Sequence, residues 1–355
     1  MINKEEIHLS WVQQISKNNR NADKILVEKV IRALLLLEGL VRSGLPFIFK
    51  GGTSLMLHFN SSKRLSIDID IMVAGKLKAL EEILEEVVKK QGFIRKELQP
   101  RTVHSAIEKE HYKFYYTPVH KTAKEEEYVL LDVLYEDVVY SELVELPVAS
   151  SFVPSKGNPV MVKVPSLDDL LGDKLTAFAP NTTGIPYYKD QDSMSMEIIK
   201  QLYDIGHLFD AVTDLGTVRK TFHRFVITEL AYRKADQKTE KQVLEDIFQT
   251  SLCMVSRGIL GNGNFEELQK GIKKVAGFIF SDKNYHIEKA IIAASKAAYL
   301  SVLISTDANR LEKFKTPQDI KDWNISHQNY TRLNKLKKSN PEAFFYWYKI
   351  VEILP

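Results

Sequence analysis

Two aspartates alternate with apolar residues in the segment 66–73, which reads SIDIDIMV. Isoleucines occupy every second position, and Asp68 and Asp70 lie between them. This period of two predicts a β-strand whose isoleucines face a core and whose carboxylates share the opposite face. With a rise of about 3.3 Å per residue, the two carboxylates lie about 6–7 Å apart. The segment therefore predicts one strand and identifies which face of that strand is buried.

Two carboxylates this close repel each other unless a counter-charge lies between them. Mg²⁺ suits the position, because it takes oxygen ligands and is commonly held by one or two carboxylates together with substrate phosphates. The alternative is an acidic strand face in contact with solvent. Aspartate is unfavourable in strands, so the pair Asp68 and Asp70 favours the metal site.

A glycine turn precedes this strand. Residues 47–49 predict a short buried strand, Gly51 and Gly52 follow, and Thr53 and Ser54 begin a short helix. Glycines let the backbone approach a phosphate closely, and the free N–H groups of a helix start favour an anion. A strand-to-helix turn that simply needs glycine explains the pattern equally well. It is neither a P-loop nor a G-x-G-x-x-G fingerprint.

The rest of the chain predicts three regions. Residues 1–45 are helical, with a stop signal at Gly44. Residues 46–165 mix strands with a helix over 76–91, and residues 166–355 are almost entirely helical. The expected strands, besides the two above, are residues 111–119, 127–137 and 160–164. We expect N-terminal helices packed on a central domain of mixed structure, followed by a helical C-terminal domain.

Composition is that of an ordinary globular protein, with 44% hydrophobic residues and a net charge of +3 over 355 residues. The single cysteine, Cys253, excludes an intrachain disulfide, and its helical context predicts a buried apolar role. No apolar run approaches the roughly 18–20 residues of a membrane span. The charged N-terminus lacks a signal-peptide core, so we expect a cytoplasmic protein that is not bound to membranes.

The last fifty residues combine basic and aromatic side chains. The basic residues are Arg310, Lys313, Lys315, Lys321, Arg332, Lys335, Lys337 and Lys338, and FFYWY at 344–348 is the densest aromatic run. Basic residues beside stacking aromatics suit single-stranded RNA or a tRNA end. The alternative is a lysine-rich surface over an aromatic core, and FFYWY fits that alternative better.

Four segments together resemble a known family. They are Gly51-Gly52-Thr53-Ser54, Arg64-x-Ser66-x-Asp68-x-Asp70, Asp173-Lys174-Leu175, and Lys200-x-x-x-Asp204. This set resembles the AbiEii/AbiGii toxin branch of the DNA polymerase β-type nucleotidyltransferase superfamily, to which the MenT toxins are related. The resemblance covers about residues 45–210. The chain departs from the pattern in a long polar segment, 180–196, between the third and fourth motifs, and its gap before Asp68 is longer than in the superfamily at large.

The resemblance implies an α+β fold: a polymerase β-type nucleotidyltransferase core with a mixed sheet, plus a helical C-terminal domain that contributes Lys174 and Asp204 to the site. It implies that Asp68 and Asp70 bind one or two Mg²⁺ ions and that an NTP is the substrate. The Gly51–Ser54 backbone and the Ser54 hydroxyl then hold phosphate oxygens, and Lys174 neutralises phosphate charge. Asp204 either positions Lys174 or activates the acceptor.

The fold that the resemblance implies has a third carboxylate on a neighbouring strand, and Asp132 in YVLLDVLY is the candidate, since it is the one acid in an apolar run. A buried, unpaired carboxylate is costly, so either a metal or a hydrogen-bond network must satisfy it. Lys174 and Asp204 also have purely structural interpretations. Lys174 can be an exposed helix lysine, and Asp204 can pair with Lys200 one helical turn away.

The biological role implied by the resemblance is that of a toxin, in a toxin–antitoxin or phage-defence system, which transfers NMP to a tRNA 3′ end or another acceptor and is restrained by a separately encoded antitoxin. Two other functions remain open. One is a small-molecule nucleotidyltransferase of the antibiotic-modifying type, and the other is a non-catalytic nucleotide-binding module. Tyr187, Tyr188 and Lys189 of the 180–196 segment form either a lid over the nucleotide or a surface loop.

Overall fold

The computed structural model describes residues 1–59, 64–100, 109–120, 124–235, 237–280, 285–308 and 310–354. The chain divides into two compact units. Unit 1 comprises Met1–Ser166 with Gly277–Lys283, and unit 2 comprises Leu167–Ala276 with Asn284–Pro355. The inclusion of the segment after residue 276 in unit 1 differs from the prediction that all residues after 165 belong to the helical C-terminal domain.

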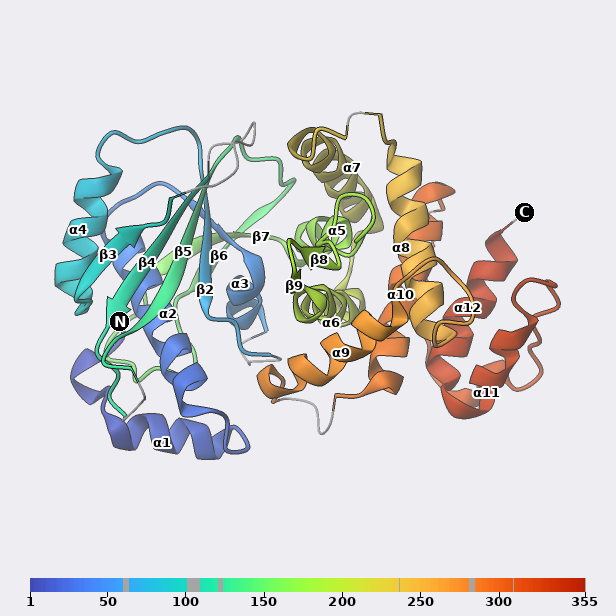
Figure 1. The fold of residues 1–355 in the computed structure, drawn as a ribbon, viewed down its shortest axis with the longest axis horizontal. Helices are drawn as coiled ribbons and strands as arrows, with labels where there is room; N and C mark the ends of the chain where they lie inside the picture. Colours follow the sequence, from blue (N-terminus) through green and yellow to red (C-terminus); the bar gives the residue numbers. More distant parts are fainter. Residues whose placement is uncertain are drawn as a thin grey trace. The chain divides into compact units, whose positions relative to one another are not determined.

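Unit 1 is built on a five-stranded sheet with the order β1-β2-β5-β4-β3. The strands are β1 (Ile48–Lys50), β2 (Asp68–Val73), β3 (Arg95–Leu98), β4 (Lys109–Tyr116) and β5 (Glu127–Tyr135). Only the β2–β5 pair is parallel, and the other three pairs are antiparallel. The predicted mixed sheet is therefore confirmed (Figure 1).

The alternation in β2 sorts its side chains as predicted. Ile69 and Ile71 are fully buried, whereas Asp68 and Asp70 are partly exposed. The isoleucines join a core with apolar residues of helices α2 (Lys24–Arg42) and α4 (Leu80–Gln91). Because successive strand side chains point to opposite faces, the carboxylates lie on the face of β2 opposite the buried isoleucines and the helices that cover them.

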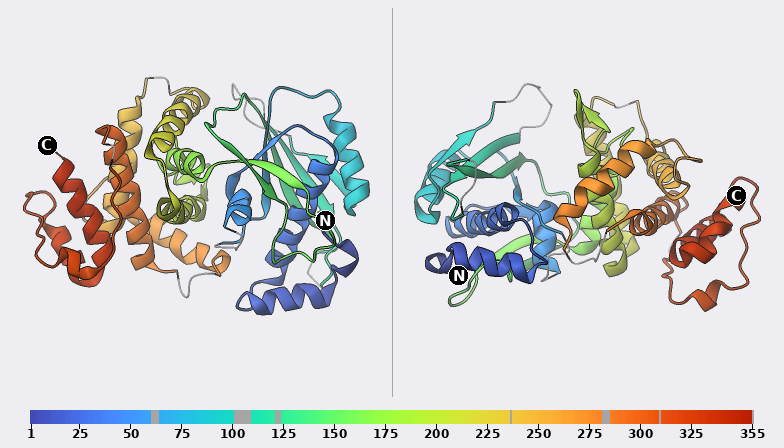
Figure 2. Two further views of the ribbon diagram at one scale, coloured as in Figure 1. Left: turned by 180° about the vertical axis from the view of Figure 1, so that it is seen from behind. Right: turned by 60° about the horizontal axis from the view of Figure 1, so that its bottom comes forward.

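The other elements of unit 1 complete this core. They are a 3₁₀ helix η1 (Lys4–Glu6), α1 (Leu9–Asn18), α3 (Gly51–His58), and a two-stranded sheet of β6 (Leu143–Pro147) and β7 (Met161–Pro165). Helix α1 packs against α2 (Figure 2). Helix α4 ends at Gly92, whose φ of 77° is the left-handed cap that glycine favours. The predicted helix over 76–91 is thus right in its end and four residues early in its start.

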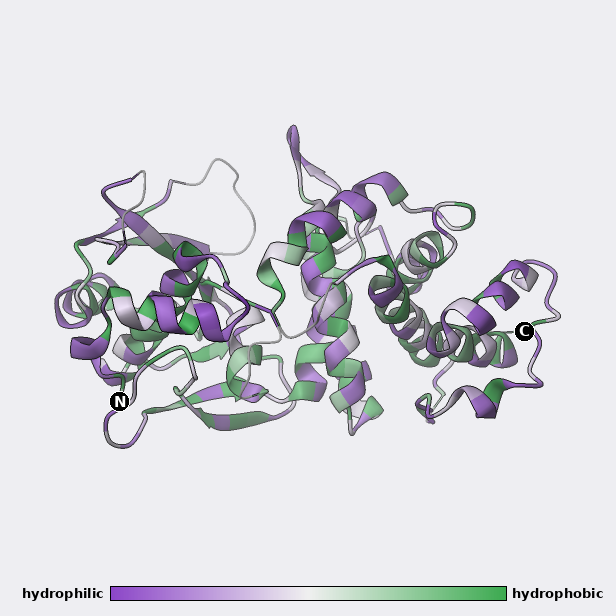
Figure 3. Cartoon of the chain, turned by 90° about the horizontal axis from the view of Figure 1, so that it is seen from below, coloured by the Kyte–Doolittle hydropathy of each residue, from purple (hydrophilic) through white to green (hydrophobic). Residues whose placement is uncertain are grey.

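Unit 2 is helical apart from one small hairpin. Its elements are α5 (Leu167–Ala177), β8 (Tyr188–Lys189), β9 (Asp192–Ser193), α6 (Ser195–Ala211), α7 (Leu215–Tyr232), α8 (Glu240–Val255), α9 (Phe265–Val275), α10 (Ile287–Ser305), η3 (Pro317–Ile320), η4 (Thr331–Lys335), α11 (Leu336–Ser339) and α12 (Pro341–Ile353), with η2 (Ala276–Phe278) at the boundary to unit 1. Helix α10 packs against α6, α8 and α12 and is buried along most of its length. Apolar and polar colours alternate around the turns of many helices, as amphipathic packing requires (Figure 3).

Burial decides between the two interpretations of the aromatic run 344–348. Phe344, Tyr346 and Trp347 are at most 1% exposed, and the Trp347 indole Nε1 donates to Ser295 Oγ at 3.1 Å. These side chains are core, so the aromatic-core alternative is correct for them. Cys253 is likewise buried, as expected, and burial raises the pKa of its thiol. No helix among the described residues is both long and apolar enough to cross a bilayer.

Candidate active site

The glycine turn and the acidic strand touch each other within unit 1. Strand β1 pairs with β2 so that Lys50 lies opposite Asp70, and α3 begins at the next residue. Gly51 has a φ of 75°, and a Cβ built on it would lie 1.9 Å from Asp70 Oδ2. Only glycine fits here, because any side chain would strain the backbone and collide with the carboxylate. The turn therefore presents its backbone directly to Asp70.

The second glycine, Gly52, is covered by residues of the arginine–serine–aspartate motif. A Cβ on Gly52 would lie 2.5 Å from Arg64 Nη2 and 2.8 Å from Ser66 Oγ. The Arg64 guanidinium is buried, and its Nη1 donates to the Leu65 carbonyl at 3.2 Å. Arg64 and Ser66 thus have a packing role, since they fill the space that the missing side chain leaves.

Both hydroxyls of the turn donate hydrogen bonds to backbone carbonyls. Thr53 Oγ1 donates to the Asp68 carbonyl at 2.6 Å, and Ser54 Oγ donates to the Gly51 carbonyl at 2.8 Å. Both residues are fully buried. These bonds tie α3 to β2 and fix the start of the helix. The N-cap residue Lys50 makes no side-chain cap, so the first-turn N–H groups keep their preference for an anion.

Asp132 lies beside Asp70, because the parallel β2–β5 register pairs these two residues. Its side chain is 37% exposed, and its Oδ1 lies 2.6 Å from His111 Nδ1. The expectation of a buried Asp132 is therefore wrong: it faces the open side of the sheet and is bonded to histidine. Sequence reasoning missed His111. A signal existed, since Tyr112, Phe114 and Tyr116 alternate as buried residues on the opposite face of β4.

The oxygen donors on this face fit a hard divalent cation by their chemistry. Asp68, Asp70 and Asp132 offer carboxylate oxygens from two adjacent strands, the ligand type that Mg²⁺ prefers. Within the described ranges, no group of three or more His, Cys, Asp or Glu side chains already has the arrangement of a metal site.

The other two motifs meet within unit 2. Lys174 on α5 lies 3.0 Å from Asp204 Oδ2 on α6 and donates to Gln201 Oε1 at 2.9 Å. The side chains of Lys174 and Asp204 are only 9% and 3% exposed. The interpretation of Lys174 as an exposed lysine is wrong, and Lys200 pairs with Glu197 at 2.9 Å. Packing of α5 against α6 brings together two motifs that lie thirty residues apart.

The 180–196 segment is fixed to α9. The backbone N–H of Asn264 donates to the Tyr187 hydroxyl at 3.1 Å, and Ser193 Oγ donates to Glu267 at 2.5 Å. The ammonium of Lys270, together with the Ser193 hydroxyl, holds the pKa of the Glu267 carboxyl down to about 2. The hairpin is thus anchored to α9 by Tyr187, just before β8, and by Ser193 in β9, and the half-exposed Tyr188 also bonds Glu267.

Comparison with known families gives one match. The model of the family described as "Nucleotidyl transferase AbiEii toxin, Type IV TA system" matches residues 35–271. This span is about two thirds of the chain and contains all four motifs. A search of curated proteins found no match.

Two solved structures from Helicobacter pylori are similar to the chain. One is JHP933, at 16% identity and a TM-score of 0.43, with 81% of this chain and 94% of that chain covered. The other, proposed to be a nucleotidyltransferase, is 17% identical with a TM-score of 0.42, and 79% and 94% of the two chains are covered. At this level of similarity, the family model alone carries the assignment.

Proposed function

The chain belongs to the AbiEii family of nucleotidyl transferase toxins, and we propose that it is the Mg²⁺-dependent toxin of a toxin–antitoxin system, transferring NMP from an NTP to the 3′ end of a tRNA. The observation that carries this proposal is the contact between the glycine turn and the acidic strand. The Gly51 backbone faces the Asp70 carboxylate with no room for a side chain between them. A phosphate held by the turn then lies beside the carboxylates that hold its metal.

The proposal assigns roles to the three carboxylates and to the backbone at the start of α3. Asp68 and Asp70 hold one or two Mg²⁺ ions, and Asp132 completes the donor set. When bound, the metal supplies positive charge at the α-phosphate and lowers the pKa of the attacking hydroxyl. The first-turn N–H groups of α3 bind phosphate oxygens. We assign this contact to the backbone rather than to the Ser54 hydroxyl, because that hydroxyl donates to Gly51.

Lys174 and Asp204 follow the family resemblance in this proposal. Lys174 neutralises triphosphate charge, and Asp204 with Gln201 holds its ammonium in one orientation. A lysine that is this buried needs such partners, because an unpaired buried charge is costly. Asp204 is thus a positioning residue for Lys174, and this choice leaves the activation of the acceptor to the metal site.

His111 is a further positioning residue. It holds Asp132 through a hydrogen bond of 2.6 Å and so limits the directions in which that carboxylate can point. Hydrogen-bonded partners of metal ligands typically change metal affinity about 10–100-fold. We propose this role for His111 at the face shared by Asp70 and Asp132.

The acceptor is the part of the proposal that needs the most direct test. Purified protein is incubated with each α-³²P-labelled NTP, Mg²⁺ and total tRNA, and the products are separated on a denaturing gel. The expected result is label on tRNA with one preferred NTP, abolished by EDTA. Label on protein or on a small molecule would instead support the antibiotic-modifying type of reaction. Nucleotide binding without any transfer would overturn enzymatic nucleotidyl transfer by this chain.

The toxicity is tested separately. The family implies a partner that restrains the toxin, and a cytoplasmic setting follows from a tRNA substrate. Expression of the chain alone should arrest growth, and Asp70→Asn should relieve the arrest at equal protein level. Growth arrest that persists with Asp70→Asn would show that toxicity does not come from nucleotidyl transfer.

A further inference from the structure

The sheet face that carries Asp132 continues onto β4 and β3. Register places Lys113 of β4 opposite Leu130, two residues before Asp132, so Lys113 is a diagonal neighbour of Asp132 at about 7–8 Å. Two residues further along β4, Tyr115 lies opposite Tyr128 of β5, and the centres of the two rings are 5.8 Å apart. All of these side chains are half-buried. A cation and an aromatic pair therefore follow Asp132 along one face of the sheet.

Lys113 makes no ion pair with any residue that the structure describes. The carboxylate opposite it, Glu97 of β3, is engaged elsewhere, since it accepts from the Tyr115 hydroxyl at 3.0 Å and from Gln99 Nε2 at 3.0 Å. The Lys113 ammonium instead lies 4.9 Å from the centre of the Tyr128 ring. A contact of this kind orients the ammonium without neutralising it, so Lys113 keeps its charge for an anion.

Arg95 and Tyr115 form a flat stack on the same face. Arg95 of β3 lies opposite Tyr115, and its guanidinium carbon is 3.6 Å from the centre of the Tyr115 ring. Arg95 Nη1 donates to Glu126 at 2.8 Å, and 47% of the Arg95 side chain is exposed. Guanidinium and aromatic planes receive unstacked bases in single-stranded RNA recognition, and the outer face of this guanidinium is suited to that contact.

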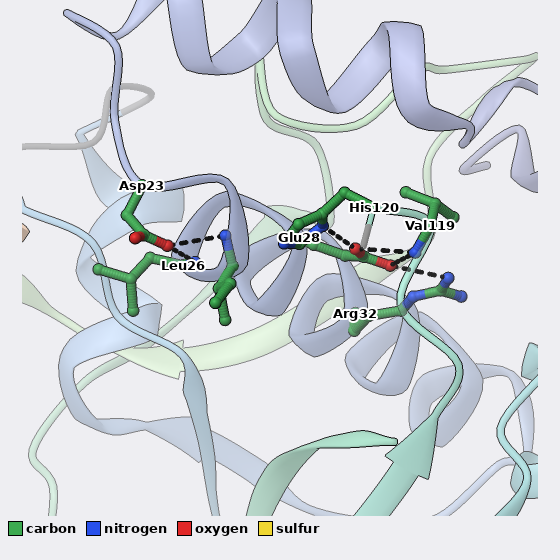
Figure 4. A network of polar contacts seen from close by, with 7 residues as sticks. Asp23, Leu26, Glu28, Arg32, Val119 and His120 are labelled. Carbon is green, nitrogen blue, oxygen red and sulfur yellow. Dashed lines mark hydrogen bonds and ion pairs between the residues drawn. The ribbon is translucent and has the colours of Figure 1, made fainter. Parts of the chain in front are cut away.

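The strand ends that carry the two tyrosines are fixed to α2. Glu28 of α2 is fully buried, accepts from the Val119 backbone N–H at 3.0 Å, and lies 2.9 Å from His120 Nδ1, just after β4 (Figure 4). The start of β5 is held by the Lys29–Glu127 ion pair at 3.0 Å. These contacts hold the end of β4 and the start of β5 in place before a ligand binds, which lowers the ordering cost of binding.

The glycine turn and these residues lie on opposite sides of the aspartates. In the sheet order β1-β2-β5-β4-β3, the turn follows β1, whereas Lys113, Tyr115 and Arg95 lie on β4 and β3. In nucleotidyl transfer, the attacking hydroxyl and the leaving pyrophosphate lie roughly in line on opposite sides of the α-phosphorus. With the β- and γ-phosphates at the turn, the acceptor hydroxyl approaches from the side of β5 and β4.

We propose that Lys113, Arg95 and Tyr115 form an acceptor surface, which binds the single-stranded 3′ end of an RNA. This inference rests on the proposed function, since it names the residues that receive the acceptor of that reaction. The Lys113 ammonium binds a backbone phosphate near the 3′-terminal nucleotide, and the base of an upstream nucleotide stacks on the Arg95 guanidinium. The spacing fits this order, because Tyr115 lies opposite a residue four positions before Asp132, about 13 Å along β5.

The bound 3′ end is then directed at the aspartates. Its terminal hydroxyl oxygen forms the new bond to the α-phosphorus of the NTP, the bond from that phosphorus to pyrophosphate breaks, and the hydroxyl proton passes to solvent. The acceptor surface takes no part in these bond changes. It holds the strand whose end reacts, so its effect is expected on RNA affinity and on the KM for RNA.

Fluorescence anisotropy of the full chain measures RNA binding without transfer. The probes are a labelled RNA hairpin with a short single-stranded 3′ overhang and the same hairpin with a blunt end, in the absence of NTP. The wild-type chain should bind the overhang hairpin about tenfold more tightly, because a stacked base contributes affinity of this order. Equal affinity for the two hairpins would overturn the inference, since no surface would then recognise a single strand.

Two variants separate the phosphate contact from the stacking contact. Lys113→Ala should weaken binding of the overhang hairpin and reduce the slope of log affinity against log salt by about 0.7, the value for one phosphate of a single strand. Arg95→Lys keeps the charge but loses the plane, so it should weaken binding about tenfold at a nearly unchanged salt slope.

The matched control is Lys89→Ala. Lys89 is an exposed lysine of α4, which packs on the opposite side of the sheet, and its loss should leave RNA binding unchanged. The acceptor surface would be excluded if Lys113→Ala bound the overhang hairpin like Lys89→Ala. It would also be excluded if Arg95→Lys bound like the wild-type chain.

Transfer kinetics distinguish a failure of this inference from a failure of the proposed function. Lys113→Ala and Arg95→Lys should each raise the KM for tRNA about tenfold in the labelled-NTP assay and leave the KM for the NTP unchanged. Transfer with an unchanged KM for tRNA in both variants would overturn the acceptor surface and keep the function. A wild-type chain without transfer would overturn the function, whereas the anisotropy series would still show whether these residues bind a single-stranded 3′ end.

Discussion

The two pairs of motifs occupy opposite environments. In unit 1, Asp68, Asp70 and Asp132 are partly exposed and lie on a sheet face that α2 and α4 leave uncovered. In unit 2, Lys174 and Asp204 are buried and paired with each other at 3.0 Å. The first region presents carboxylates to solvent, whereas the second buries its charges as an ion pair.

This difference predicts that the two regions contribute differently to activity and to folding stability. Partly exposed carboxylates contribute little to folding, because solvent screens their interactions. A buried ion pair is coupled to folding, since removing one partner leaves the other charge without compensation. Substitutions at the three aspartates of unit 1 should therefore change activity with little loss of stability. Substitutions at the buried pair should change both activity and stability.

The largest effect is expected from Asp70→Asn. This change removes a charge from the metal-binding face and should lower the rate of nucleotidyl transfer about 10³-fold or more, since the metal contributes several kcal/mol at the transition state. Thermal stability should change little, because Asp70 is partly exposed and asparagine has the same shape. Asp137→Asn is the control, an exposed acid just after the same sheet. Equal loss of activity in both variants would contradict the special role of Asp70.

The second effect concerns the buried pair. Asp204→Ala leaves the Lys174 ammonium buried without its carboxylate and should lower the free energy of unfolding by about 3–5 kcal/mol. Chemical denaturation of purified protein measures the loss. The double variant Lys174→Met with Asp204→Leu should recover most of this stability while remaining inactive. A double variant that is no more stable than Asp204→Ala would show that the charges of Lys174 and Asp204 do not stabilise each other.

The third effect concerns Gly51→Ala. The new Cβ would collide with Asp70 Oδ2, and a displaced catalytic carboxylate should lower activity about 10²-fold. Gly75→Ala is a matched control, because Gly75 has a similar φ of 82° but no neighbour within 4 Å of its Cβ position. It should cost about 1 kcal/mol of stability, as backbone strain alone, and leave activity intact. Equal loss of activity in both variants would assign the effect to strain.

The smallest effect is expected from His111→Ala. Loss of the bond to Asp132 should weaken divalent-metal binding about tenfold, the lower end for such partners. Mn²⁺ binding followed by electron paramagnetic resonance measures this without activity. Lys113→Ala, two residues along the same face of β4, should leave Mn²⁺ binding unchanged. An unchanged Mn²⁺ affinity in His111→Ala would leave His111 with a structural role only.

Local patterns predicted the main elements of unit 1 well. The alternation around Asp68 and Asp70 gave the strand and its buried face, and Gly44 and Gly92 marked two helix ends. Strand β3, strand β6 and the β8–β9 hairpin were not predicted, since short exposed strands have little hydrophobic alternation. The return of residues 277–280 to unit 1 also left no local signal, because it depends on contacts such as the Arg64–Ile279 bridge.

By itself, the sequence determined the acidic strand, the glycine turn, the family and the choice of candidate residues, because period, turn chemistry and motif spacing are local properties of a chain. Only the tertiary structure placed Asp132 beside Asp70, bonded it to His111, and paired Lys174 with Asp204. Register between strands and packing between helices bring together residues that are distant in the chain, and burial sets the cost of each charge.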